Sequence, residues 1–359
     1  MSSTGATWGI NAKIGVDYAI QDTNALGGLV VGGMRYKIQE ITYDDAMDTA
    51  KAADLAHMIV SQNGRYTTMC STAMVLSVED YFAANNIFNQ AQTIGQPKII
   101  GSKWPLQIMG GLDPADFGPS TYYSYLAANM GVKTIAMLNP DSDNGHIWGG
   151  LVKQDVQNLN IPVKIVYDGY YIPGTQDYSP MINKILTLNP DMIDMTGAAV
   201  GEAALFAKQV RDAGYKGICG DLCTQGDPAT SWQVAGANST GWLTVGFAGK
   251  DPTPLYTTFR QKEEKLTGQP MYVSPPYVYD QTMQLFKAIN QANTFEPYKV
   301  MDILSNMKWD GLYGPTNYIG NTPGSPFDIK HAISVGEPLI RFTTNSQAEW
   351  VTRGSYPFQ

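Results

Sequence analysis

Residues 133–168, KTIAMLNPDSDNGHIWGGLVKQDVQNLNIPVKIVYD, contain two apolar runs separated by a helical pattern. The first run, Lys133–Leu138, predicts a buried strand, Trp148–Asn158 predicts a helix, and Val163–Asp168 predicts a second strand. A strand, a helix and a strand in this order form a βαβ unit with parallel strands. This stretch therefore predicts an α/β fold built on a parallel sheet.

The same alternation of strands and helices extends outward in both directions. Further helices are predicted over Trp8–Asn24, Thr49–Gln62, Ala73–Asn85, Ser120–Met130, Tyr178–Leu188 and Glu202–Ala213. Further strands are predicted over Tyr36–Tyr43, Tyr66–Cys70, Asn86–Gln90, Leu106–Met109, Met192–Met195 and Gly217–Gly220. No strand precedes the first helix, although a doubly wound sheet usually begins with a central strand. We expect either an internal start at Met1 or another segment in that place.

Length and charge exclude several classes of partner. A chain of 359 residues with 43% apolar residues can build two domains. Charged residues make up 16%, the net charge is −8, and no run of Lys and Arg occurs, which argues against nucleic acid and anionic membrane surfaces. No stretch of 18 apolar residues predicts a membrane span, and the first residues do not form a signal peptide.

Residue types and motifs also argue against an enzyme. With three His and three Cys, the chain has few metal ligands, and we expect no metal and no cofactor. Cys219 and Cys223 remain open as a disulfide pair. Ser305–Lys308 fits S-x-x-K without its companion motifs, and the Gly-rich stretch 27–33 follows a helix, so it predicts a turn into the next strand rather than a dinucleotide site.

Several local motifs occur in the order found in one known family. They are Thr4–Gly9, Asp22–Leu29, Tyr43–Ala46, Gly174–Ser179, Asn189–Asp191, Gln209–Gly214 and Tyr277–Asp280. With them, nearly the whole chain resembles the type I periplasmic solute-binding proteins, and in particular the leucine/isoleucine/valine-binding receptors of ABC importers. The missing opening strand and export signal are omissions relative to that family.

This resemblance implies two doubly wound parallel-sheet lobes joined by a three-crossover hinge. Residues 1–112 plus 250–315 would form the N-terminal lobe, and residues 113–249 plus 316–359 the C-terminal lobe, with the ligand cleft between them. The resemblance also implies a periplasmic or otherwise extracytoplasmic monomer that closes on a small molecule and presents it to an ABC transporter permease, without inserting into the membrane.

Ligands of open α/β sheets bind beyond the carboxyl ends of the strands, which directs attention to the residues there. In the N-terminal lobe, the resemblance assigns ligand carboxylate binding to Ser71 and Thr72, where a hydroxyl and backbone N–H groups meet at a helix start. Helix capping alone is the alternative for these two residues. The remaining expected contacts in this lobe are Trp8, Ala91, Gln92 and Thr93.

The remaining expected ligand contacts depart more from the residues that are usual in the family. Asn144 and His146 stand where branched-chain receptors have Tyr-Gly, and Ala199 stands where the family often has an aromatic residue. Asp221 is the one acidic residue near the position that pairs with an amino acid's ammonium group, and Tyr277 would add to the cleft wall.

Two functions from different classes remain open at this point. The first is a transport receptor for a small amino acid or related carboxylate, with an aromatic or other apolar carboxylate as the alternative ligand. The second is the ligand-sensing domain of a signalling system with the same fold. A transmembrane or DNA-binding segment in the full-length gene product would favour the sensor, and neighbouring permease and ATPase genes would favour transport.

Overall fold

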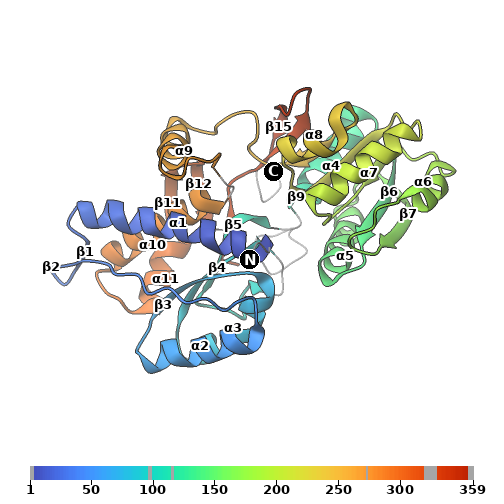
Figure 1. The fold of residues 1–359 in the computed structure, drawn as a ribbon. Helices are drawn as coiled ribbons and strands as arrows, with labels where there is room; N and C mark the ends of the chain where they lie inside the picture. Colours follow the sequence, from blue (N-terminus) through green and yellow to red (C-terminus); the bar gives the residue numbers. More distant parts are fainter. Residues whose placement is uncertain (1–3, 96–98, 115–116, 272–273, 319–329, 355–359) are drawn as a thin grey trace. The chain divides into compact units, whose positions relative to one another are not determined.

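The computed structural model describes residues 4–95, 99–114, 117–271, 274–318 and 330–354 (Figure 1). The chain divides into two compact units. Unit 1 combines Met1–Pro114 with Pro252–Val335, and unit 2 combines Ala115–Asp251 with Gly336–Gln359. The expected division assigned residues 316–335 to the other lobe. In the structure β12 (Gly314–Tyr318) pairs with β11 (Lys308–Gly311) and β13 (Ile333–Ser334) inside unit 1, and the last boundary between the units follows Val335.

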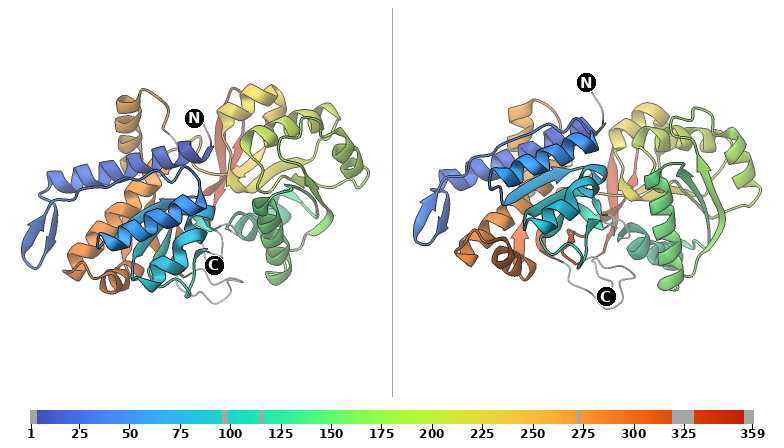
Figure 2. Two further views of the ribbon diagram at one scale, coloured as in Figure 1. Left: turned by 60° about the horizontal axis from the view of Figure 1, so that its bottom comes forward. Right: turned by 90° about the horizontal axis from the view of Figure 1, so that it is seen from below.

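Unit 1 is built on the parallel sheet β3-β4-β5. Its strands are β1 (Leu29–Val31), β2 (Met34–Tyr36), β3 (Tyr66–Cys70), β4 (Phe88–Gly95), β5 (Gln107–Pro114), β11, β12 (Gly314–Tyr318) and β13 (Ile333–Ser334). Its helices are α1 (Thr4–Ala25), α2 (Thr49–Ser61), α3 (Thr72–Ala84), α9 (Pro254–Thr267), α10 (Ser274–Ala292) and α11 (Pro297–Ser305). Helix α1 packs along α10, and α2 packs along α3 (Figure 2).

Unit 2 contains a sheet in the order β15-β14-β10-β9-β8-β6-β7. Its strands are β6 (Thr134–Pro140), β7 (Lys164–Tyr171), β8 (Met192–Asp194), β9 (Ile218–Gln225), β10 (Leu243–Val245), β14 (Pro338–Phe342) and β15 (Ala348–Arg353). Its helices are α4 (Phe117–Met130), α5 (Asp143–Asn158), α6 (Ser179–Leu186), α7 (Val200–Asp212), α8 (Pro228–Ala235) and the 3₁₀ turn η2 (Gly236–Ser239). β6 to β10 run parallel, and β14 and β15 are antiparallel additions.

The expectations for the segment after α1 hold only in part, since Gly32 and Gly33 do turn into a strand but that strand ends at Tyr36. The Gly-rich stretch forms an antiparallel hairpin of β1 and β2, because Gly32 and Gly33 both take the positive φ that a two-residue hairpin turn requires. The strand expected over Tyr36–Tyr43 is absent beyond Tyr36, and residues 37–45 belong to no helix or strand. Alternation describes a strand's two faces, but a strand also needs a hydrogen-bonded neighbour.

Candidate functional site

Ser71 and Thr72 lie where β3 ends and α3 begins, as expected from their position after an apolar run. Ser71 has φ +75°, a left-handed conformation that is rare and costly for a residue with a side chain. Its hydroxyl makes no capping hydrogen bond to α3. Val75 donates the first intrahelical hydrogen bond to Ser71, so the N–H groups preceding it have no partner within the helix.

The segment containing Ala91, Gln92 and Thr93 is strand rather than the expected loop, because β4 continues to Gly95. Ala91 is fully buried in a cluster with Val75 and Ile99, so its methyl group belongs to the core. Gln92 and Thr93 are also buried. Gln92 pairs with Cys70 of β3, which places these residues beside the end of that strand.

Gln281 of α10 is a buried partner that sequence reasoning missed. Its carbonyl oxygen accepts hydrogen bonds from the side-chain amides of Gln92 at 3.0 Å and Gln90 at 3.3 Å. Gln90 and Gln92 alternate with Ala91 along β4, so they occupy the face of the sheet toward α10. Two Gln residues at alternate positions of one strand were the available signal, but nothing in the neighbouring sequence identifies their partner.

Tyr277 is buried one turn before Gln281 and stacks on Tyr313 with ring centroids 4.6 Å apart. It is therefore part of an aromatic stack within unit 1. Trp8 lies in α1, and its side chain falls outside the described part of the structure.

In unit 2, His146 lies in the first turns of α5, beyond the carboxyl end of β6. Its Nε2 lies 2.8 Å from Oδ1 of Asp141, and its ring stacks on Tyr170 with centroids 4.2 Å apart. The imidazole remains about half exposed. Asn144 lies in the same helix, with its side chain outside the described residues. The exposed His146 and the half-buried Tyr170 thus form a stacked aromatic pair.

Ala199 and Asp221 lie at the same edge of the unit 2 sheet. Ala199 is exposed and immediately precedes α7. Asp221 lies inside β9, which continues to Gln225 rather than ending at Gly220 as expected, because Asp221 pairs in register with Thr244 of β10. Asp221 is only 3% exposed. A carboxylate this deeply buried is a poor partner for a ligand's ammonium group.

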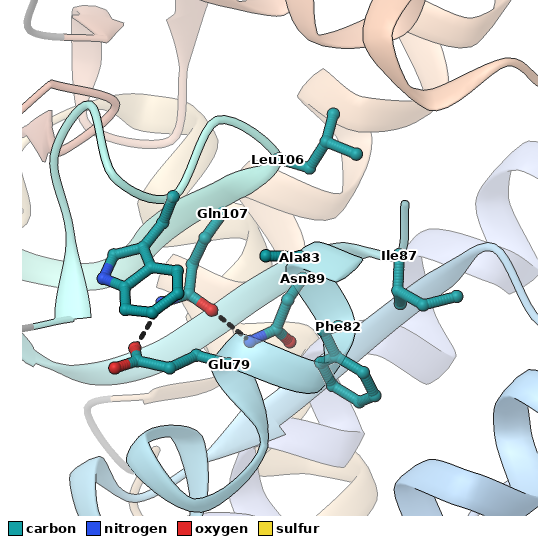
Figure 3. A pocket seen from close by; sticks show the side chains of 8 residues that line it. Glu79, Phe82, Ala83, Ile87, Asn89, Leu106 and Gln107 are labelled. Atoms are coloured by element: carbon teal, nitrogen blue, oxygen red, sulfur yellow. Dashed lines mark hydrogen bonds between the residues drawn. The ribbon is translucent and has the colours of Figure 1, made fainter. Parts of the chain in front are cut away.

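A network of polar side chains with a small cavity beside it lies at the other end of unit 1 (Figure 3). Gln107 donates to Glu79 at 3.3 Å, and Asn89 donates to Gln107 at 2.8 Å. Asn89 and Gln107 belong to the amino ends of β4 and β5, opposite the edge with Ser71. The adjoining cavity leaves about 10 Å³ for the centre of a water molecule, which is room for one water. An organic solute does not fit there.

Glu79 should nevertheless affect stability. Burial raises its pKa from 4.5 to about 7, so the folded protein favours the protonated carboxyl, and the unfolding free energy falls as pH rises from about 4.5 to 7. Substituting Glu79→Gln removes this dependence. In urea denaturation, the unfolding free energy of the variant relative to the wild type should be about 1–2 kcal/mol higher at pH 8 than at pH 5. If the difference in unfolding free energy between variant and wild type were the same at both pH values, the raised pKa of Glu79 would not be the cause.

Within the described residues, no group of three or more His, Cys, Asp or Glu side chains is placed to hold a metal ion. In the same part of the chain, no helix combines the length and hydropathy that a membrane span requires. Cys70 and Cys219 are free cysteines, and Cys223 lies outside the residues whose side chains are described.

Comparison with known proteins gives consistent matches over nearly the whole chain. A family model described as periplasmic binding protein matches residues 1–327. The Leu/Ile/Val-binding protein of Escherichia coli strain K12 is 24% identical over 339 residues, covering 92% of this chain and 88% of that protein.

Solved structures show the same fold. The branched-chain amino acid transporter substrate-binding protein LivJ from Streptococcus pneumoniae, in complex with isoleucine, superposes with a TM-score of 0.76 at 16% identity, covering 98% of this chain and 96% of that chain. A solute-binding protein of an ABC transporter from R. palustris, in complex with benzoate, gives 0.76 at 15% identity, covering 98% and 93%. The architecture is therefore the type I periplasmic binding fold.

Proposed function

The chain belongs to the periplasmic binding protein family, and we propose that it is the extracytoplasmic solute receptor of an ABC importer. Members of this family bind solutes and are not enzymes. The proposed mechanism is closure of two lobes on a ligand that contacts both, since a ligand shifts a conformational equilibrium only through its differential affinity for the two states. The permease of the importer is the proposed partner.

The observation that supports a carboxylate ligand best is the end of β3. There Ser71 keeps its hydroxyl out of the helix cap, and the first N–H groups of α3 lack intrahelical partners. A helix N-terminus with free N–H groups favours an anion. The strained backbone of Ser71 is typical of residues held in place for a binding role. We therefore propose a small amino acid or related carboxylate as the ligand, as in the E. coli and S. pneumoniae relatives.

An aromatic carboxylate is the second candidate, and two observations in unit 2 favour it. Asp221 is nearly inaccessible, which weakens the case for an ammonium group on the ligand. His146, whose ring is about half exposed, stacks on the half-buried Tyr170, and such a stacked pair suits a ring more than an aliphatic side chain. The R. palustris relative is described with benzoate bound.

A thermal-shift screen separates the two candidates. Leucine and isoleucine form one arm, and benzoate and 3,4-dihydroxybenzoate form the other. A ligand that binds only the folded protein raises its stability, by about 2.7 kcal/mol at one hundred times its dissociation constant. A shift with the first arm supports the amino acid, and a shift with the second supports the aromatic acid. If all four compounds leave the melting temperature unchanged, neither ligand class is correct.

Substituting Ser71→Ala should weaken binding of the ligand found in that screen about tenfold, because a hydrogen bond to a charged group contributes about 1.5–3 kcal/mol. Trp8→Ala, which removes the expected apolar contact, should also weaken it. Ser77→Ala is the matched control, since Ser77 lies in the same helix and bonds to the Met74 carbonyl. Calorimetry that finds unchanged affinity for Ser71→Ala and Trp8→Ala would overturn this site assignment.

A further inference from the structure

The side chain of Gln281 on α10 is the centre of a buried amide cluster on one face of β4. Its Oε1 accepts hydrogen bonds from Nε2 of Gln92 at 3.0 Å and from Nε2 of Gln90 at 3.3 Å. All three residues are buried, with Gln281 only 1% exposed. A carbonyl oxygen has two lone pairs, so one side chain of α10 uses its full accepting capacity on β4. Removing that oxygen would take a partner from two buried amide groups, which is costly.

The backbone of Gln92 in turn holds the turn at the end of β3. The Ser71 N–H donates to the Gln92 carbonyl at 3.4 Å, and the Ser71 carbonyl accepts from the Val75 N–H at 3.0 Å. Ser71 is therefore tied to β4 on one side and to α3 on the other. A residue with a side chain keeps a φ of +75° only where its surroundings enforce that conformation. The position of Gln92 thus affects the position of Ser71 and of the first turn of α3.

Helices α10 and α3 contact β4 from opposite faces of the sheet (Figure 1). Successive residues of a strand point to opposite faces, so Gln92 meets α10 while Ala91 packs against Val75 of α3. The contact with α3 is apolar and has no preferred direction. The hydrogen bond to Gln281 is directional, and it weakens steeply when its angle is distorted. It is therefore the contact that sets how β4 lies against α10.

Helix α10 is itself firmly held, which makes it a suitable anchor for this bond. Asp280, the residue before Gln281, accepts a hydrogen bond from the Leu312 N–H at 3.1 Å. One turn earlier, the ring of Tyr277 stacks on that of Tyr313. Leu312 and Tyr313 lie in the turn between β11 and β12, and α1 packs along α10 as well. Helix α10 is thus fixed by the β11–β12 hairpin and by α1.

We propose that Gln281 is a positioning residue for the ligand site at the end of β3, an inference that rests on the proposed carboxylate-binding role of Ser71. Gln281 holds the side chain of Gln92, and the carbonyl of Gln92 holds the N–H of Ser71. The hydroxyl of Ser71 and the first N–H groups of α3 are thereby kept in one arrangement. Because Gln281 is so deeply buried, it acts through Gln92 rather than through contact with the ligand.

The test compares two matched substitutions on α10. Gln281→Met keeps a side chain of similar size and removes the accepting oxygen. Gln284→Met makes the same change three residues later, at an equally buried side chain whose amide atoms have no hydrogen-bond partner among the described residues. For a ligand found in the thermal-shift screen, calorimetry should show affinity about three- to tenfold lower for Gln281→Met, the effect of losing one buried hydrogen bond. Gln284→Met should leave the affinity unchanged.

A second measurement requires no ligand. Amide hydrogen exchange of residues 71–75 should be about threefold faster in Gln281→Met than in the wild type, because local opening of this segment becomes easier. In Gln284→Met it should match the wild type. Exchange of residues 107–109 in β5 is the internal control, since a general loss of stability would accelerate exchange there too. Equal exchange of residues 71–75 in the two variants would overturn the proposal.

Gln92→Met breaks the same hydrogen bond from the β4 side, so it provides the result if Gln281→Met does not fold. Residues that act through one shared bond are not additive, and the double variant should bind the ligand about as well as either single variant. Weakened binding by Gln92→Met beside unchanged binding by Gln281→Met would refute the role of Gln281. If none of the four compounds binds the wild type, the proposed ligands are wrong, and the exchange of residues 71–75 still confirms or refutes the hold of Gln281 on Ser71.

Discussion

Substituting Gly15→Ala is expected to lower the free energy of unfolding by about 2–3 kcal/mol. A β-carbon at this position in α1 would lie 2.5 Å from the carbonyl oxygen of Pro275 and 2.8 Å from Cβ of Val278. Both atoms belong to α10, and the first is backbone, so relief requires the two helices to separate. The packing of α1 on α10 therefore depends on a residue without a side chain.

The same helix provides the control for this prediction. Gly9 also lies in α1, but a β-carbon there would meet nothing within 4 Å. Because glycine inside a helix is about 0.5–1 kcal/mol less favourable than alanine, Gly9→Ala should be neutral or stabilising. Urea denaturation followed by circular dichroism measures both changes. Similar effects of the two substitutions would show that helix propensity, rather than the contact with α10, controls stability here.

Much of the α/β architecture is predictable because its signal is local. The strand over Tyr66–Cys70 has the predicted bounds, and the helix over Thr49–Gln62 differs by one residue at its end. Apolar periodicity fixes such elements within a window of a few residues. The segment Tyr36–Tyr43 has an equally clear pattern, but in the part of the chain that the structure describes only its first residue, Tyr36, pairs with a neighbouring strand. Pairing is a property of the fold rather than of the segment.

The candidate site is likewise predictable from the sequence only in part. Ser71 and Thr72 could be placed at the end of a strand because the strand itself was predictable. The bond between Gln92 and Gln281 joins residues 189 positions apart, and no spacing rule connects them. Asp221 was expected after a strand, but β10 extends its pairing with β9 past that residue. Contacts made by sheet neighbours and packed helices decide which side chains stay accessible, and local patterns do not contain them.

Asp194 is expected to make the protein less stable as pH rises from about 4 to 7. This carboxyl of β8 is fully buried, and its Oδ2 accepts hydrogen bonds from the hydroxyls of Tyr123 and Thr196. Burial outweighs these bonds and raises its pKa from 3.8 to about 6. The folded state thus favours the protonated form, and the associated stability is complete below pH 3.8 and lost as pH rises through 6. The loss is about 3 kcal/mol at 1.36 kcal/mol per pKa unit.

Substituting Asp194→Asn removes this dependence while keeping an oxygen that can accept from Tyr123 and Thr196. In urea denaturation between pH 4 and pH 8, the difference in unfolding free energy between variant and wild type should therefore change in favour of the variant as pH rises. A difference that stays constant over this range would mean that the carboxyl titrates alike in the folded and unfolded states.

Asp191, three residues upstream, should show the opposite behaviour. It is exposed, and the backbone N–H groups of Lys133 and Thr134 donate to its Oδ2 at 2.9 Å each. The bond from Lys133 is the largest cause that lowers its pKa below 3.8. The ionised Asp191 carboxylate therefore contributes to the unfolding free energy above pH 3.8, and this contribution is lost as pH falls. We expect Asp191→Asn to lower the unfolding free energy at pH 7 and to lower it less at pH 3. Both substitutions turn an aspartate into asparagine. If the effect on the unfolding free energy changes with pH in opposite directions for the two variants, burial controls the pKa of Asp194 and hydrogen bonding controls the pKa of Asp191.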